Sequence, residues 1–124
     1  QVQEIIDRTD GQLAVLSGDD GLCVPMYSVG GRGVISVVSN PAPALTGALY
    51  RDYRVGRTDA AAAGQIALRS LIESLFCEAN PQPVKMAMHL LGMMSPVVRP
   101  PLVTATDQAR QRVQADLSKL GLLG

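Results

Sequence analysis

The sequence predicts an α/β fold that starts with two parallel strands and continues as an all-helical region. Short runs of apolar and β-branched residues at 13–16 and 33–38 indicate strands, and every later segment from Pro43 onward has helical periodicity. Strands joined through one helix are parallel, and a parallel sheet needs cover on both faces. Because two strands alone cannot supply that burial, we expect a partner chain or a longer protein to provide further strands.

The first half of the chain alternates helix and strand. Apolar residues at positions 2, 5 and 6 predict a helix over 2–9 that closes at Asp10-Gly11. The run 13–16 is predicted as a strand buried on both faces, and Asp19 or Asp20 can cap the next helix, over 21–29. That helix ends at Gly30-Gly31.

The second strand, over 33–38, stops at Ser39-Asn40-Pro41. We expect Ser39 or Asn40 to be the N-cap of the helix that follows and Pro41 to fit its first turn. The remaining helices are predicted over 43–55, from Asp59 to about Phe76, over 84–91 and from a Thr106 cap to Gly121, with turns at Gly56 and Gly92 and a proline-rich break at 80–83.

Composition excludes several classes of function. Eleven basic and eleven acidic residues give a net charge of zero, which disfavours binding to nucleic acid or to an anionic membrane. No apolar run approaches the roughly 20 residues that span a bilayer. We expect Cys23 and Cys77 to be free, buried thiols in a reducing cytoplasm, and the five methionines to fill the core.

Candidate ligand-binding residues follow the two strands, since ligand sites in βα units lie at the carboxyl ends of strands. Gly18 would let a ligand approach the backbone, and Asp19 could hold a polar substrate or accept a proton. The spacing of Asp19 and Asp20 favours the alternative that both are helix caps, and the same alternative applies to Ser39 and Asn40.

Other reactive residue types lack the surroundings that catalysis needs. His89, the only histidine, has no acid or cysteine at ligand spacing, so we expect no zinc site. Lys85 and Lys119 fall on predicted surface helices, which do not supply the dry pocket that amine catalysis requires. The glycine-rich segment 30–33 precedes a strand instead of opening a helix, so it is not expected to bind phosphate.

Several strings, in unbroken order, resemble the carboxyl-terminal part of the dihydrodipicolinate synthase family, also called hydroxytetrahydrodipicolinate synthase. They are Leu16-Ser17-Gly18-Asp19-Asp20, Gly33-Val34-Ile35-Ser36-Val37, the stretch from Phe76 to Lys85 with its Asn-Pro-X-Pro-Val-Lys core, Arg99-Pro100-Pro101-Leu102 and Leu120-Gly121-Leu122-Leu123. The resemblance covers nearly the whole chain. Ala79, Cys77 and Pro100 depart from the residues usual in the family, which are proline, valine and leucine.

The resemblance implies a partial (β/α)₈ TIM barrel, of which residues 1–55 would hold the last two strands, followed by a C-terminal helical domain over 56–124. It implies a lyase that condenses pyruvate with aspartate semialdehyde through a lysine Schiff base in the diaminopimelate route to lysine. It implies no cofactor, no nucleic acid or membrane partner, a homotetrameric parent enzyme and a cytoplasmic location.

For site residues, the resemblance places Ile35 against bound pyruvate, with Gly18 and Asp19 bordering the substrate pocket. The family's Schiff-base lysine and relay tyrosine would lie upstream of Gln1, so we expect no catalytic residue in this chain and no activity from the isolated polypeptide. Two alternatives stay open: a non-catalytic assembly or binding module, and part of a sister pyruvate aldolase of the N-acetylneuraminate lyase or keto-deoxy-sugar-acid type.

Overall fold

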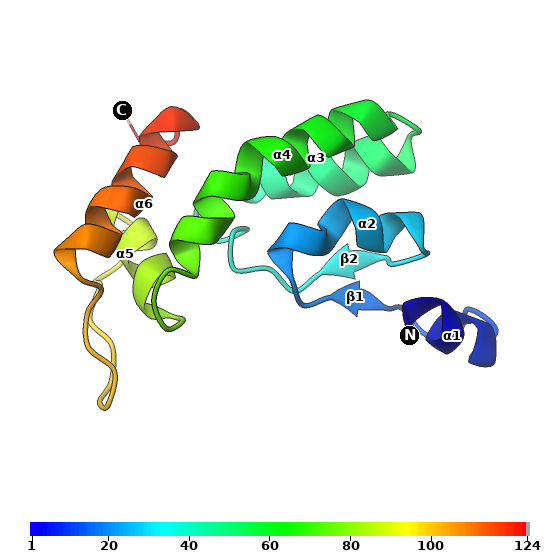
Figure 1. The fold of residues 1–124 in the computed structure, drawn as a ribbon, viewed down its shortest axis with the longest axis horizontal. Helices are drawn as coiled ribbons and strands as arrows, with labels where there is room; N and C mark the ends of the chain where they lie inside the picture. The colour runs from blue at the N-terminus through cyan, green and yellow to red at the C-terminus, as the bar shows by residue number, and fades with distance from the viewer. Residues whose placement is uncertain (124) are drawn as a thin grey trace.

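The computed structural model of the chain describes residues 1–123 and contains a small parallel sheet with a larger set of helices (Figure 1). In order, the elements are α1 (Val2–Arg8), β1 (Leu16–Ser17), the 3₁₀ helix η1 (Asp20–Leu22), α2 (Cys23–Ser28), β2 (Gly33–Val34), α3 (Pro43–Arg54), α4 (Thr58–Leu75), α5 (Gln82–Leu90) and α6 (Asp107–Lys119). The predicted order of an α/β first half and an all-α second half is confirmed.

The sheet consists of β1 and β2, which run parallel with Leu16 opposite Gly33 and Ser17 opposite Val34. Helix α2 contacts both strands and lies over one face (Figure 1). The side chains of Leu13 and Leu16 are 57% and 43% exposed. The expectation that the first strand is buried on both faces is therefore wrong within this chain, because a second covering layer is not part of residues 1–123.

Both strands are shorter than predicted, and β2 ends at Val34 for a specific reason. The backbone N–H groups of Val37 and Val38 donate to the buried Asp20 carboxylate, at 2.8 and 3.2 Å, so this segment leaves the extended course of a strand. The prediction that Ser39 or Asn40 caps α3 is also wrong. Their side chains bond to the Ser36 and Val37 carbonyls, and the helix begins with Pro43 after an Ala42 N-cap.

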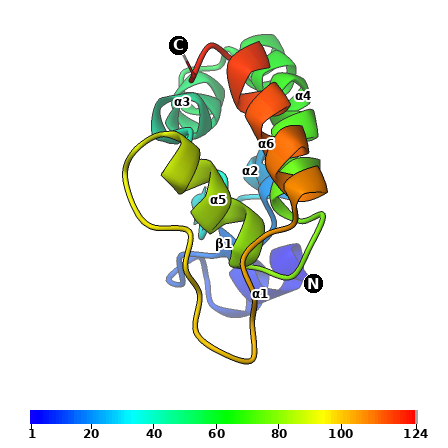
Figure 2. The same ribbon diagram turned by 90° about the vertical axis from the view of Figure 1, so that its left-hand side faces the viewer.

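One hydrophobic core joins the two halves of the chain. Helices α3 and α4 lie side by side, and α6 packs against α4 (Figures 1 and 2). The fully buried members of this core come from the first half as well as from the helices after residue 55; they include Cys23, Val38, Leu49, Leu68, Leu71, Leu75, Val113 and Leu117. The sheet and the helices are thus held by shared burial of apolar surface.

The helix boundaries agree with the sequence signals to within two residues. Gly56 has φ +80° and ends α3, and the Thr106 hydroxyl accepts from the Ala109 N–H at 3.2 Å, as expected for an N-cap. Helix α5 begins at Gln82 and holds Pro83 in its first turn, where a missing N–H costs nothing. No helix within residues 1–123 has the length and apolar character needed to cross a membrane.

Some predicted burials are wrong. Both cysteines are free, but Cys77 is exposed, because it follows the last turn of α4 and faces an open pocket. Met93 and Met94 are exposed as well. They lie in the long loop between α5 and α6 that Figure 2 shows looping out from the helices, so no core is available to them.

Candidate functional site at the carboxyl edge of the sheet

The carboxyl ends of β1 and β2 meet at one edge of the sheet. Beyond the paired residues, the Ile35 N–H donates to the Ser17 carbonyl at 2.8 Å, which extends the parallel ladder by one bond. Ile35 therefore lies next to the start of the segment Gly18-Asp19. The structure brings together the three residues that the sequence analysis named as substrate-binding.

Gly18 and Asp19 are both exposed at this edge. A Cβ built on Gly18 would have no atom within 4 Å, so the space beside its backbone is open. The Asp19 Oδ1 accepts from the Gly21 N–H at 2.7 Å and caps η1, which confirms the expected capping role. The carboxylate nevertheless stays in contact with solvent.

Asp20 differs from its neighbour, since only 2% of the residue is exposed. Its carboxylate accepts from the Ser36 hydroxyl and from the Val37 and Val38 N–H groups. It therefore joins the loop after β1 to the loop after β2. Sequence reasoning missed this role because the donors lie 16 to 18 residues away, beyond the reach of any local pattern.

Ile35 is 71% exposed although it is large and apolar. Its N–H is already used by Ser17, so its carbonyl group and side chain are the parts left to contact a ligand. Ser39 and Asn40 bond within their own turn.

The basic candidates lie on the helices after residue 80. Lys85 and His89 are on α5 and Lys119 ends α6. Lys85 lines a pocket with Asn40 of the loop after β2, and Lys119 lines another pocket with residues of α3 and α4. The Lys85 amine donates to the Val97 carbonyl, and His89 Nδ1 lies 3.2 Å from the Met94 carbonyl oxygen. Within residues 1–123, no cluster of His, Cys, Asp and Glu side chains could hold a metal ion.

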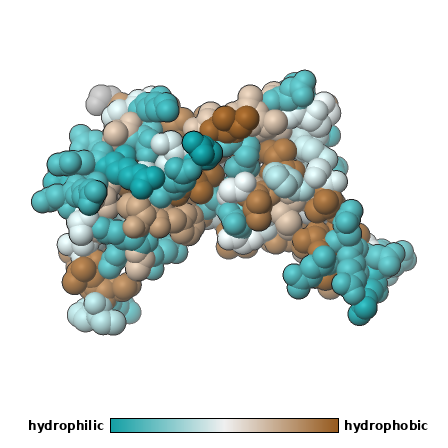
Figure 3. Space-filling view, in the orientation of Figure 1, coloured by the Kyte–Doolittle hydropathy of each residue, from teal (hydrophilic) through white to brown (hydrophobic). Residues whose placement is uncertain are grey.

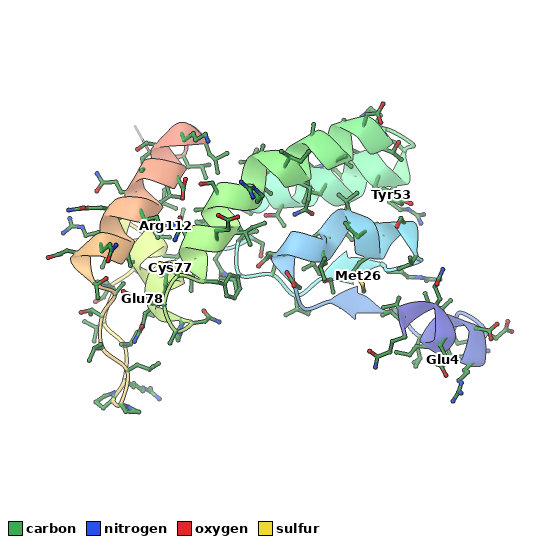
Figure 4. All side chains as sticks on the ribbon, viewed as in Figure 1. Glu4, Met26, Tyr53, Cys77, Glu78 and Arg112 are labelled. Atoms are coloured by element: carbon green, nitrogen blue, oxygen red, sulfur yellow. The ribbon has the colours of Figure 1, made fainter. Side chains whose placement is uncertain are left out.

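A pocket of about 170 Å³ lies where α4 ends and α6 begins, and Figure 4 labels three of its residues. Cys77, Glu78 and Arg112 line it with Thr106. The Glu78 carboxylate accepts from the Thr106 hydroxyl and, at 3.2 Å, from the Thr106 N–H. This carboxylate therefore secures the start of α6, and no sequence signal pointed to the pocket.

Cys23 lies just behind the carboxyl edge and is fully buried. Burial raises the pKa of its thiol from 9.0 to about 11, and the nearby negative charge of Asp20 acts in the same direction. The thiol is neutral at physiological pH and does not serve as a nucleophile at the edge.

Comparison with known proteins finds relatives that match almost all of this chain. It is 39% identical over its whole length to the 4-hydroxy-tetrahydrodipicolinate synthase of Syntrophus aciditrophicus, spanning 43% of that protein. It is 42% identical over 98% of its length to the enzyme of the same name from Methanopyrus kandleri, spanning 41% of it. The chain thus covers less than half the length of these curated relatives.

Solved structures agree with these relatives. The dihydrodipicolinate synthase of Thermotoga maritima superposes with a TM-score of 0.95 at 34% identity, over 99% of this chain and 43% of that one. A synthase variant described as monomeric gives the same TM-score at 35% identity, over 99% of this chain and 42% of that one. The profile of the dihydrodipicolinate synthetase family matches residues 1–120. The chain therefore belongs to the dihydrodipicolinate synthetase family.

Proposed function

We propose that the protein containing this segment is a 4-hydroxy-tetrahydrodipicolinate synthase, a lyase that condenses pyruvate with aspartate semialdehyde in lysine biosynthesis. The observation that carries the proposal is the match along 98–100% of the chain, at 39–42% identity, to enzymes of that name. The backbone agreement with solved synthases, at a TM-score of 0.95, supports it.

In this proposal, residues 1–55 form the last two βα units of a (β/α)₈ barrel and residues 56–124 form a helical domain. A parallel strand pair with α2 between its members is the repeating unit of such a barrel. The exposed leucines beside the sheet supply the surface on which the rest of a barrel would pack.

We assign the contact with bound pyruvate to Ile35, and we assign Gly18 and Asp19 to the border of the substrate pocket. All three are exposed, and the bond from the Ile35 N–H to Ser17 holds them at one edge. The open space beside Gly18 lets a small keto acid approach the backbone. The exposed Asp19 carboxylate can meet the polar groups of a second substrate.

The Schiff-base lysine and the relay tyrosine are assigned to a part of the protein outside these 124 residues. A lysine forms a Schiff base when its amine attacks the keto carbon and water leaves, so the amine must reach the bound substrate. The Lys85 amine donates to the Val97 carbonyl, and Lys119 lies at the end of α6 beside residues of α3 and α4. Tyr27 packs against Tyr50 and against Tyr53, with ring centroids 5.2 and 5.9 Å apart.

The parent enzyme is proposed to be a cytoplasmic homotetramer. The free thiols of Cys23 and Cys77 fit a reducing compartment. Sedimentation of the full-length gene product gives its mass directly, and a monomer, as described for one related variant, would contradict the tetramer.

The deciding experiment is borohydride trapping with pyruvate, followed by intact-mass measurement and peptide mapping. We expect a reduced pyruvyl adduct on the full-length product and none on the 124-residue polypeptide. Lys85→Arg and Lys119→Arg variants of the full-length protein are matched controls that should keep the adduct. An adduct on the short polypeptide would contradict our placement of the nucleophile, and full-length turnover of keto-sugar acids in place of aspartate semialdehyde would contradict the assigned reaction.

A further inference from the structure

The segment directly after Ile35 is held by one buried carboxylate. Asp20 belongs to η1, and both of its oxygens are occupied: Oδ1 accepts from the Ser36 hydroxyl, and Oδ2 accepts from the Val37 and Val38 N–H groups at 2.8 and 3.2 Å. Such charge-assisted bonds are stronger than neutral ones. Three consecutive residues are thereby bound to a single side chain from the other loop.

Ile35 itself is fixed from both sides. Its N–H donates to Ser17 at 2.8 Å, and the residue after it, Ser36, donates to Asp20. The Ser36 Oγ also accepts from the Ser39 N–H at 2.8 Å, so this hydroxyl has a defined donor and a defined acceptor. The peptide group between residues 35 and 36 is left with little freedom to rotate.

Asp20 is in turn anchored by α4. The Gln65 side chain donates from Nε2 to the Asp20 carbonyl at 2.9 Å and accepts at Oε1 from the Val24 N–H at 3.3 Å. Helix α4 carries the buried Leu68 and Leu71 and belongs to the rigid core. The chain of bonds therefore runs from the helical region through Asp20 to the carboxyl edge.

We propose that Asp20 is a positioning residue for the keto-acid substrate. By holding residues 36–38, its carboxylate fixes the backbone of Ile35 in the one orientation that contacts pyruvate. This inference rests on the proposed function. A small displacement of a group that contacts the substrate removes much of that group's contribution to substrate binding. Tight binding therefore requires that the residues supporting the group be rigid.

The test compares Asp20→Ala with Asp20→Asn in the full-length gene product. Alanine leaves the two N–H donors and the Ser36 hydroxyl without their acceptor. Asparagine can still accept from both N–H groups while its amide donates to Ser36. We expect the half-saturating pyruvate concentration in borohydride trapping to rise about tenfold for alanine, with substantial rescue by asparagine.

The matched control is Asp116→Ala, which removes a carboxylate from a comparable network far from the edge. Asp116 accepts from the Ser70 hydroxyl at 2.6 Å and from the Ser74 hydroxyl, and so joins α6 to α4. We expect this variant to lower the thermal unfolding midpoint while leaving the half-saturating pyruvate concentration unchanged. If the role of Asp20 were purely structural, Asp20→Ala would also lower the thermal unfolding midpoint and leave the half-saturating pyruvate concentration unchanged.

Ser36→Ala provides a milder variant if Asp20→Ala does not fold. It removes one of the three bonds and should raise the half-saturating concentration by about threefold. If wild-type protein is trapped by pyruvate and the folded variants saturate at the wild-type concentration, the positioning role is overturned and the proposed function stands. If wild-type full-length protein forms no adduct, the proposed function fails, and the positioning role fails with it.

Discussion

The two thiols of this chain have opposite environments. Cys23 opens α2 and is fully buried beside Asp20, and burial raises its pKa to about 11. Cys77 follows α4, is exposed, and lines a pocket with Glu78 and Arg112, which Figure 4 labels. Since the thiolate is the reactive form and must also be accessible, only Cys77 is available to reagents in the folded protein.

Alkylation with iodoacetamide at pH 8 should therefore modify Cys77 alone in the native protein and both cysteines after denaturation. Peptide mapping by mass spectrometry identifies the modified site. In a Cys77→Ser variant the native protein should remain unmodified. Rapid native modification of Cys23 would contradict its burial.

The raised pKa of the Cys23 thiol makes the stability of the folded chain depend on pH. Its pKa is raised from 9.0 to about 11 on folding, so the unfolded chain releases this proton at lower pH than the folded chain. The free energy of unfolding should be unaffected by this group below pH 9 and should fall between pH 9 and 11. Burial also raises the pKa of Tyr27, which adds to the fall above about pH 10. Urea unfolding across this range measures the slope, and a Cys23→Ala variant that keeps the full slope between pH 9 and 10 would contradict the assignment.

At the scale of elements, the ends of the helices could be predicted from the sequence, whereas the ends and the burial of the strands could not. Helix ends depend on local signals, such as the Thr106 hydroxyl and the positive φ of Gly56, which can be read from the sequence. The end of β2 depends on the Asp20 carboxylate 17 residues before Val37, and the exposure of Leu16 depends on which elements cover the sheet. No local pattern contains that information.

The turn between α2 and β2 shows how one small residue keeps two elements close. The Gly31 N–H donates to the Met26 carbonyl at 2.8 Å, and a Cβ on Gly31 would lie 2.7 Å from that same oxygen. Backbone atoms cannot move aside as a flexible side chain can. We expect Gly31→Ala to lower the free energy of unfolding by about 1–3 kcal/mol, the usual range for overpacking.

Chemical denaturation of the full-length protein measures this change. Gly18→Ala is the matched control for stability, because its Cβ would meet no atom within 4 Å. A Gly31→Ala variant as stable as Gly18→Ala would show that the turn relaxes without cost.

At the scale of the whole molecule, residue chemistry alone did not identify the function. The net charge is zero, and the lysines and the histidine lie on α5 and α6, not in the loops that follow β1 and β2. The three edge residues Gly18, Asp19 and Ile35 are common types whose proximity follows from the parallel pairing of β1 and β2. The order of several strings along the chain indicated the family, and the family match over residues 1–120 confirms that membership.

The surface beside the sheet predicts how the isolated 124-residue polypeptide behaves. Leu13, Leu16 and Ile35 are exposed next to a sheet of only two strands, and Figure 3 shows apolar surface in this region. Unpaired strand edges and contiguous apolar surface favour association with other chains. We expect the mass in sedimentation velocity to increase with concentration.

Lysine substitutions test whether that surface drives the association. Leu13→Lys combined with Ile35→Lys should shift the polypeptide toward the monomer, because charged side chains at a strand edge oppose pairing. Val55→Lys is the matched control: Val55 is 64% exposed but follows α3, away from the strands, so its replacement should leave association unchanged. A monomeric mass at every concentration, with a sharp thermal transition independent of concentration, would contradict the prediction and would show that the two-stranded sheet is stable without further strands.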